Sequence, residues 1–218
     1  MKLKFITLEN VDKKNHSYLE EEDGILYLGE YHSGLGCEGA GCNSLIFNLK
    51  KTPDKIGTVE WDYKQGAITR IAALITKLME KNGTEIEKIY WIPVPPSKIE
   101  TDPMFDDRVH EILKLAQDKC TNKNNIVANV VKQTSNRIAS ATSREARNPS
   151  SLISNYEMDD ITDYNPETDI IIIFDDVLTT GCHFKAVKSL ILDKYKDSNI
   201  IGIFVAKVVR QEELASVI

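Results

Sequence analysis

The chain of 218 residues carries a formal net charge of -6 at pH 7, and 42% of its residues are hydrophobic. This length and composition favour one α/β domain with an extra lobe over two independent domains. The acidic balance argues against a broad basic surface for nucleic acid, although it leaves room for a local basic pocket.

The N-terminus lacks the uninterrupted apolar run of a secretory signal, and no later run approaches the length of a membrane-spanning helix. We therefore expect a cytoplasmic protein without a membrane partner. The four cysteines are scattered, and only Cys37 and Cys42 lie close together. This pattern favours reduced thiols over a zinc site.

Residues 1–62 are expected to form a small N-terminal lobe, and residues 63–218 the core of the domain. Within the lobe, Leu3–Leu8 and Ile25–Tyr31 have the pattern of strands and are separated by turn-forming residues. A glycine-rich segment, residues 34–41, lacks the strand and helix that flank a dinucleotide-binding loop. We interpret it as a flexible turn.

The core begins with elements whose apolar residues recur at helical spacing or form the short runs of buried strands. These elements are a helix at Gln65–Asn82, a strand at Lys88–Val94, a helix at Phe105–Asp118 and a strand at Ile126–Val131. The first strand runs into Pro93-Val94-Pro95-Pro96-Ser97-Lys98, where the prolines fix the backbone and turn the chain out of the sheet. Asp106, Asp107 and Arg108 are interpreted as the solvated start of the second helix.

A long polar segment, residues 132–155, follows without any apolar period. It carries Lys132, Arg137, Arg144 and Arg147 but a single acid before Asn155, although the protein as a whole is acidic. Segments of this length inside a compact domain are typically functional lids or disordered. An anion-binding lid and a merely flexible basic loop are both compatible with this composition.

The segment Asp169–Phe184 has the strongest functional signal. Its apolar, β-branched run Ile170–Phe174 predicts a strand buried on both faces of a parallel sheet, and this run ends in Asp175 and Asp176. Carboxylates rarely follow so apolar a run unless another group pairs with them. The next residues, Val177-Leu178-Thr179-Thr180-Gly181, form a loop that opens a helix at His183–Lys194. Backbone N–H groups at such a helix start bind anions.

Two acids beside an anion-binding loop predict a ligand that has both hydroxyls and a phosphate. A ribose 5-phosphate fits, since its 2- and 3-hydroxyls can donate to the two carboxylates while its phosphate lies on the loop. Thr179 and Thr180 add hydroxyl donors, and Gly181 allows a close approach of the backbone. With a final strand at Ile200–Val205, the order of elements predicts an α/β fold. Its doubly wound parallel sheet would bind the ligand at the carboxyl ends of the strands.

The sequence I-I-F-D-D-V-L-T-T-G resembles the motif with which type I phosphoribosyltransferases bind 5-phosphoribosyl 1-diphosphate (PRPP). I-P-V-P-P-S-K is similar to the proline turn of competence-protein-F-like (ComF-like) members of that family, and L-I-F-N-L-K resembles their L-I-x-x-L-K segment. S-R-E-A-R-N is imperfectly similar to the E-R-x-x-N piece of their mobile loop. Their R-G-F-N-Q segment is missing, and Phe105-Asp106-Asp107-Arg108 stands in its place.

This resemblance implies the type I phosphoribosyltransferase fold, with residues 1–62 as a hood over the base. It implies Mg²⁺-dependent transfer of phosphoribosyl from PRPP to a small nitrogenous base, with release of pyrophosphate, and it allows a homodimer. The site residues that it implies are Asp175, Asp176, Arg144 and Arg147 as catalytic residues; Val177, Leu178, Thr179, Thr180 and Gly181 for the 5-phosphate; Val94, Pro95, Ser97 and Lys98 for pyrophosphate; and Asp175 and Asp176 for Mg²⁺, directly or indirectly.

Two hypotheses of function remain open at this stage. The first is an enzyme of nucleotide salvage that transfers phosphoribosyl to a base. The second is a protein that keeps the fold as a sensor of PRPP or of a nucleotide, or that serves DNA uptake or processing as ComF-like proteins are thought to do. The basic loop favours turnover, since a sensor need not bind a leaving pyrophosphate.

Overall fold

The computed structural model describes residues 5–39, 41–81, 86–136 and 148–209 of the chain. In this part a six-stranded sheet has the order β1-β2-β8-β7-β3-β4, and a two-stranded sheet pairs β5 with β6. The strands are β1 (Ile6–Thr7), β2 (Gly24–His32), β3 (Ile89–Pro93), β4 (Asn125–Val127), β5 (Val131–Gln133), β6 (Tyr156–Met158), β7 (Ile170–Leu178) and β8 (Asn199–Val209). The α-helices are α1 (Asn10–Lys13), α2 (Asn43–Leu49), α3 (Val59–Met79), α4 (Arg108–Lys119), α5 (Pro149–Ile153) and α6 (Cys182–Lys194), and the 3-10 helices are η1 (Gly36–Glu38) and η2 (Pro53–Lys55).

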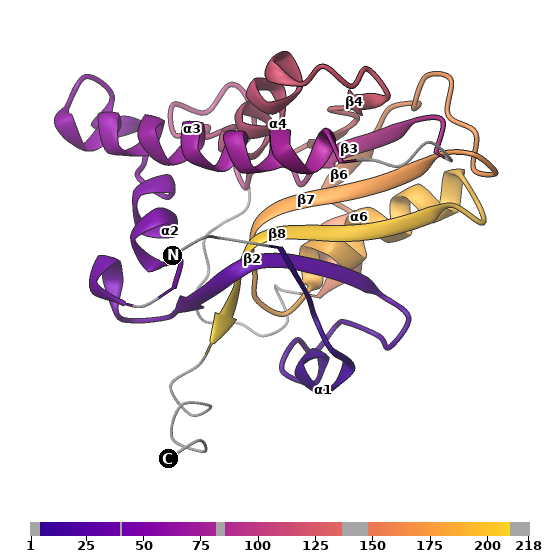
Figure 1. Cartoon of the computed structure of the whole chain (residues 1–218), viewed down its shortest axis with the longest axis horizontal. Helices are drawn as coiled ribbons and strands as arrows, with labels where there is room; N and C mark the ends of the chain where they lie inside the picture. The colour runs from indigo at the N-terminus through magenta and orange to yellow at the C-terminus, as the bar shows by residue number, and fades with distance from the viewer. Residues whose placement is uncertain (1–4, 40, 82–85, 137–147, 210–218) are drawn as a thin grey trace.

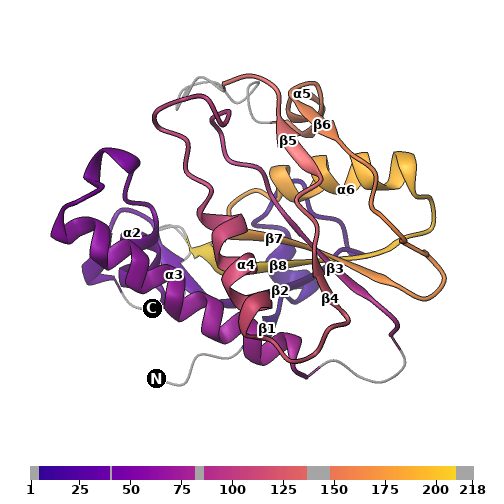
Figure 2. The ribbon, with the colours of Figure 1, turned by 90° about the horizontal axis from the view of Figure 1, so that it is seen from above.

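The large sheet is parallel except at its edge strand β1, which runs antiparallel to β2. Helices cover both faces: α3 and α4 pack on one and α6 on the other (Figures 1 and 2). The central strand β7 shows why, because alternate side chains of a strand point to opposite faces. Ile172 and Phe174 pack with α3 and α4, whereas Ile171 and Ile173 pack with α6. The predicted α/β fold with a doubly wound parallel sheet is confirmed.

Most of the predicted elements are present, with shifted ends. Helix α3 begins at Val59 rather than Gln65, and α4 begins at Arg108 rather than Phe105. Strand β7 does not end at Phe174 but continues to Leu178, and β8 continues to Val209. Both strands extend beyond their apolar runs because they pair with each other as far as Leu178 and Lys207, and the last residues of β8 pair with β2.

The N-terminal segment contributes directly to the core. Strand β2 lies parallel to β8, with Leu26 opposite Ile203, so the run Ile25–Tyr31 that was assigned to the lobe is a strand of the central sheet. Its side chains are apolar on both faces because both faces are covered. The boundary expected at residue 62 falls inside helix α3. The division of the chain into hood and core stays a prediction.

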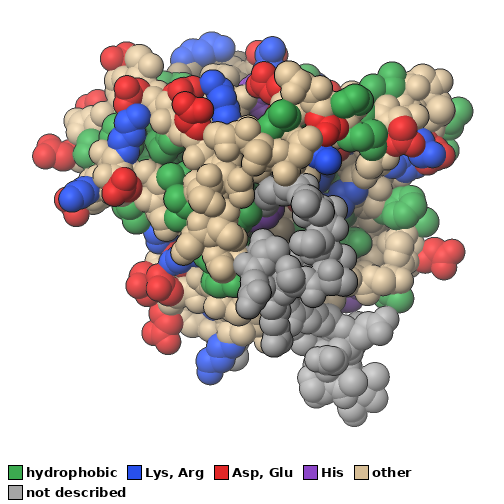
Figure 3. All heavy atoms as spheres, turned by 180° about the vertical axis from the view of Figure 1, so that it is seen from behind, with side chains coloured by type: hydrophobic (Ala, Val, Ile, Leu, Met, Phe, Trp, Pro, Cys, Tyr) green, Lys and Arg blue, Asp and Glu red, His purple; other side chains and the backbone are tan. Residues whose placement is uncertain are grey.

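The polar segment after β4 contains more regular structure than its composition indicated. Strands β5 and β6 pair antiparallel, with Lys132 opposite Glu157. Helix α5 begins after Asn148, whose side chain accepts a hydrogen bond of 2.7 Å from the Ser151 N–H. Arg144 and Arg147 lie outside the described residues. Over the face drawn in Figure 3, acidic and basic side chains are interspersed. No helix of the described part has both the length and the hydropathy that crossing a membrane requires.

Candidate functional site

A cavity of about 250 Å³ lies at the carboxyl ends of β3 and β7. Segments that are distant in sequence meet there. They are the turn after β3 (residues 94–98, the proline turn), the end of β7 with the loop that follows it (residues 179–181, the threonine loop), and the start of α4. Of the predicted site residues, those that line the cavity are Val94, Pro95, Ser97, Lys98, Asp175, Asp176, Val177, Leu178, Thr179 and Gly181. Thr180 is not among the lining residues.

The sheet brings the proline turn and the acids together. Strands β3 and β7 are parallel neighbours, with Pro93 opposite Phe174, so their carboxyl ends leave the sheet side by side. One residue further on, the Val94 N–H donates to the Phe174 carbonyl at 2.9 Å. Pro95 lies two residues beyond that pairing and has no N–H to continue it, so the chain turns away and opens the cavity.

Asp175 and Asp176 belong to β7 itself rather than following it, and their side chains therefore point to opposite faces of the strand. The Asp175 Oδ1 accepts a hydrogen bond of 2.7 Å from the Asp176 N–H, and its Oδ2 lies 3.8 Å from Nδ1 of His183 in α6. Asp176 points toward α4. The strand thus presents one acid on each side of the cavity floor.

The pKa values of the two carboxyls are shifted in opposite directions. Burial, together with the negative charge of Asp176, raises the pKa of Asp175 to about 7. Burial would also raise the pKa of Asp176, but the positive charges of Arg108 and Lys50 outweigh it and lower that pKa. At neutral pH Asp176 is therefore the ionised member of the pair, while Asp175 is near its titration midpoint.

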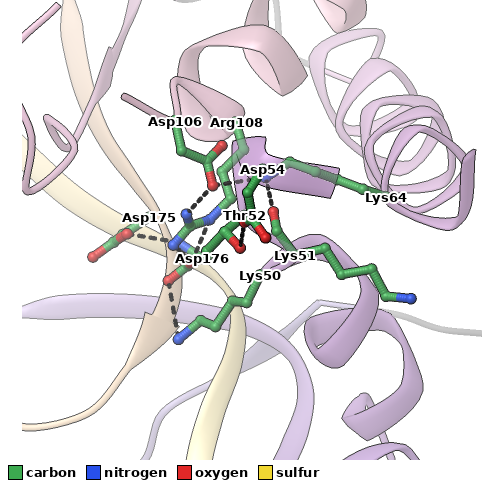
Figure 4. A network of polar contacts seen from close by, with 9 residues as sticks. All are labelled: Lys50, Lys51, Thr52, Asp54, Lys64, Asp106, Arg108, Asp175 and Asp176. Atoms are coloured by element: carbon green, nitrogen blue, oxygen red, sulfur yellow. Dashed lines mark hydrogen bonds and ion pairs between the residues drawn. The ribbon is translucent and has the colours of Figure 1, made fainter. Parts of the chain in front are cut away.

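Arg108 is a cavity residue that the sequence analysis did not assign to the site, because it had been taken as part of a solvated helix start. Its Nε and Nη2 donate to Asp176 Oδ2 at 2.9 and 2.7 Å, and its Nη1 donates to Asp106 Oδ2 at 2.7 Å (Figure 4). Asp106 in turn accepts from Lys64 Nζ at 2.6 Å. The interpretation of Asp106 and Arg108 as solvated is wrong: their side chains are only 12% and 24% exposed.

Lys64, a residue of α3, is the last member of this series of ion pairs. Its side chain is 1% exposed, and its Nζ also donates to the Lys51 carbonyl at 2.6 Å. Burial lowers the pKa of Lys64, and the Asp106 carboxylate partly offsets that effect. A buried lysine needs such a partner, since an uncompensated charge would be strongly unfavourable there. No local pattern in the sequence identifies this pair, whose members are 42 residues apart.

Lys50 is a second cation that the sequence analysis did not assign to the site. It caps the C-terminus of α2 and reaches the cavity, with its Nζ 4.0 Å from Asp176 Oδ1 (Figure 4). The sequence did contain a signal for Lys50, because it is the lysine of the L-I-F-N-L-K segment that resembles the ComF-like one. Lys98, from the proline turn, also lines the cavity; its Nζ lies 3.6 Å from Asp102 Oδ2, and its side chain is 35% exposed.

The threonine loop leads directly into the start of α6. Gly181 occupies the residue before the helix with φ +81°, in the left-handed region that favours glycine. The outer side of the loop is covered by the N-terminal segment: the Tyr18 N–H donates to the Thr180 carbonyl at 3.0 Å, and a ring nitrogen of His16 contacts the Thr179 carbonyl. The inner side, with Thr179 and Gly181, faces the cavity.

Comparisons with known proteins give little beyond this geometry. No protein-family model matches the sequence, and no curated protein matches it. Among solved structures, a xanthine-guanine-hypoxanthine phosphoribosyltransferase from Helicobacter pylori aligns with 71% of this chain and 94% of its own, at 10% identity and a TM-score of 0.36. A similarity at this level is too weak to assign a fold family or an activity.

Proposed function

We propose that the protein is a phosphoribosyltransferase that uses PRPP as donor and a small nitrogenous base as acceptor, and that it releases pyrophosphate. One observation carries the proposal. The proline turn, the acid pair and the threonine loop, which the sequence resemblance relates to pyrophosphate, ribose and 5-phosphate respectively, line a single cavity. No single motif predicts that these segments lie together, since about 80 residues of chain separate the turn from the loop.

The chemistry of the cavity fits the charges that such a reaction develops. Loss of pyrophosphate from C1 of the ribose passes through a transition state in which positive charge grows on the sugar and negative charge on the leaving group. Asp175 and Asp176 would accept hydrogen bonds from the ribose hydroxyls, and the ionised Asp176 would place negative potential near the ring. Lys50 and Lys98 would stabilise the phosphate charges. No protein nucleophile is needed.

Mg²⁺ is part of the proposal as a partner of the diphosphate. Within the described residues no group of three or more His, Cys, Asp or Glu side chains could hold a metal ion. Protein sites for Mg²⁺ commonly supply one or two carboxylates, and substrate phosphates and water complete the coordination. Asp175, whose carboxyl lines the cavity beside His183, suits that role, directly or through water. When bound, the ion would neutralise charge on the leaving group.

Several narrower expectations belong to the same proposal. A ComF-like protein is supported by the place of Lys50 at the cavity, since the segment that contains it resembles the ComF-like one. The roles of Arg144 and Arg147 at the pyrophosphate, the cytoplasmic location and the homodimer stay predictions.

A second candidate is a sensor that binds PRPP or a nucleotide without transfer. The pairing of Asp176 with Arg108 favours it to some degree, because a ribose hydroxyl must displace a charged hydrogen bond to reach that carboxylate. The same displacement is compatible with catalysis if Arg108 has a role once it is released.

Binding and turnover distinguish these candidates. The full-length protein is incubated with PRPP and Mg²⁺ against a panel of purine and pyrimidine bases, and released pyrophosphate is followed. Release that depends on one base supports the enzyme; an increase in Tm with PRPP, without release, supports the sensor. The double variant Asp175→Asn, Asp176→Asn is expected to lose the PRPP-dependent increase in Tm. If that variant still responds to PRPP as the wild type does, or if the wild type does not respond, the proposed site is wrong.

A further inference from the structure

Arg108 occupies an unusual position for a cation. It is the first residue of helix α4, where the positive end of the helix dipole disfavours positive charge. Its side chain nevertheless turns into the cavity rather than into solvent. The guanidinium is retained there because Asp106 and Asp176 both accept from it.

The two carboxylates hold different edges of the guanidinium. The edge made by Nε and Nη2 contacts Asp176 in the cavity, whereas Nη1 contacts Asp106 outside the acid pair. Asp106 is itself fixed by the buried Lys64, so this second attachment does not depend on Asp176. A ligand hydroxyl that took over Asp176 would therefore free one edge of Arg108 and leave the other anchored.

The freed edge suits a phosphate group. Nε and Nη2 form a planar pair of donors that binds two oxygens of one phosphate or carboxylate. Its position selects among the phosphates of a PRPP-like ligand. The threonine loop, which is expected to bind the 5-phosphate, lies at the start of α6, on the face of β7 that Asp175 occupies. Arg108 lies on the other face, with Asp176, and is therefore placed for the pyrophosphate rather than for the 5-phosphate. The proline turn, which is expected to bind pyrophosphate, lines the same cavity.

We infer that Arg108 binds the pyrophosphate group of the substrate after ribose hydroxyls displace it from Asp176, and that Asp106 and Lys64 are the residues that position it. The inference rests on the proposed function and adds to it a substrate-contacting residue. It also gives the pairing in the present structure a role. Arg108 keeps Asp176 ionised and satisfied until the hydroxyls arrive, and it then becomes available to the leaving group.

Two separate probes test this inference on the full-length protein. Ribose 5-phosphate reports on the acids and the threonine loop. Inorganic pyrophosphate with Mg²⁺ is titrated into protein already saturated with ribose 5-phosphate, so that it reports on the leaving-group site once ribose hydroxyls have replaced Arg108 at Asp176. Both affinities are measured by isothermal titration calorimetry. Arg108→Gln removes the charge, Arg108→Lys keeps the charge without the planar pair of donors, and Asp106→Asn weakens the anchor. Arg70→Gln is the matched control, since Arg70 is an exposed arginine of α3.

Arg108→Gln is expected to weaken pyrophosphate binding by roughly 10- to 100-fold, the usual effect of losing a hydrogen bond between charged groups. Binding of ribose 5-phosphate should stay unchanged or tighten, because Arg108 no longer competes for Asp176. Arg108→Lys and Asp106→Asn should give intermediate losses for pyrophosphate alone, and Arg70→Gln should change neither affinity. This selectivity is what a merely structural role would not produce.

The results that overturn the inference differ from those that overturn the proposed function. If the wild type binds ribose 5-phosphate and PRPP but Arg108→Gln leaves both probe affinities unchanged, or reduces both in proportion, Arg108 does not contact pyrophosphate. If the wild type binds neither ribose 5-phosphate nor PRPP, the proposed function fails first. A fall in Tm of Arg108→Gln with both ligands lost, and with no recovery in Arg108→Lys, assigns Arg108 to structure alone.

Discussion

The neighbouring acids of β7 should have opposite effects on stability. Replacing Asp175 with asparagine keeps the Oδ1 that accepts from the Asp176 N–H and removes a carboxyl that is unfavourable when ionised. The pKa of Asp175 is about 7 in the folded protein, whereas the ordinary pKa of an aspartate side chain is 3.8. A difference of about 3 units corresponds to about 4 kcal/mol as an upper value, since each unit is worth about 1.4 kcal/mol. We use about half of this upper value, about 2 kcal/mol, as the expected effect.

The sign of the pH dependence follows from proton binding. Between pH 3.8 and about 7 the unfolded chain releases the proton of Asp175 while the folded protein retains it, so the free energy of unfolding decreases as pH rises through this range. Asp175→Asn should therefore match the wild type near pH 4 and exceed it at pH 8. For a chain of this length, about 2 kcal/mol corresponds to an increase in Tm of roughly 4–8 °C.

Urea unfolding followed by far-ultraviolet circular dichroism at pH 4, 6 and 8 measures this effect. Asp176→Asn is the paired variant: it leaves Arg108 with one carboxylate fewer and should lower the free energy of unfolding by about 1–3 kcal/mol at pH 8. Other groups titrate in the same range, but they cancel in the difference between wild type and Asp175→Asn. A difference that does not grow with pH, or a variant less stable than the wild type at pH 8, would refute the electrostatic reasoning.

Three further substitutions test the backbone conformation and the buried charges elsewhere in the fold, each by equilibrium urea unfolding. Gly181→Ala should cost about 1–2 kcal/mol or more, because φ is +81° and a Cβ would lie 2.6 Å from Leu19 Cδ2. Gly66→Ala, in the exposed face of α3 where a Cβ meets nothing within 4 Å, should instead add about 0.5–1 kcal/mol. Asp23→Asn should cost about 3 kcal/mol, because the fully buried Asp23 carboxylate pairs with two lysines of α6. Those lysines lower the pKa of Asp23 against the effect of its burial, so this contribution should be lost as pH falls below about 3.8.

The sequence predicted the central features of the fold because their signals are local. The run Ile170–Phe174 is short, apolar over its whole length and rich in β-branched residues, which indicates a strand covered on both faces. Helix α3 was recognised from its periodic apolar face and strand β3 from its apolar run and proline exit. The ends of β7 and β8 were misplaced because pairing between the two strands extends them beyond their apolar runs.

Features that depend on distant partners were not predictable in this way. Strands β5 and β6 are three residues each, and a polar segment lies between them, so neither has a periodicity that stands out. Strand β2 was identified as a strand but not as a central one, because the sequence does not state which strand lies beside β8. The contact between Arg108 and Asp176 joins residues 68 apart.

Arg108 still left a trace in the sequence that a physical reading can use. A helix start preceded by two aspartates satisfies the usual preference for acidic residues at that end, but an arginine at its first position contradicts it. Local rules are most often broken where a residue serves a distant partner or a ligand. The contradiction falls at Phe105–Arg108, where the chain departs from the ComF-like pattern. An arginine that breaks the preference of a helix start is therefore a candidate for a site residue even where no motif includes it.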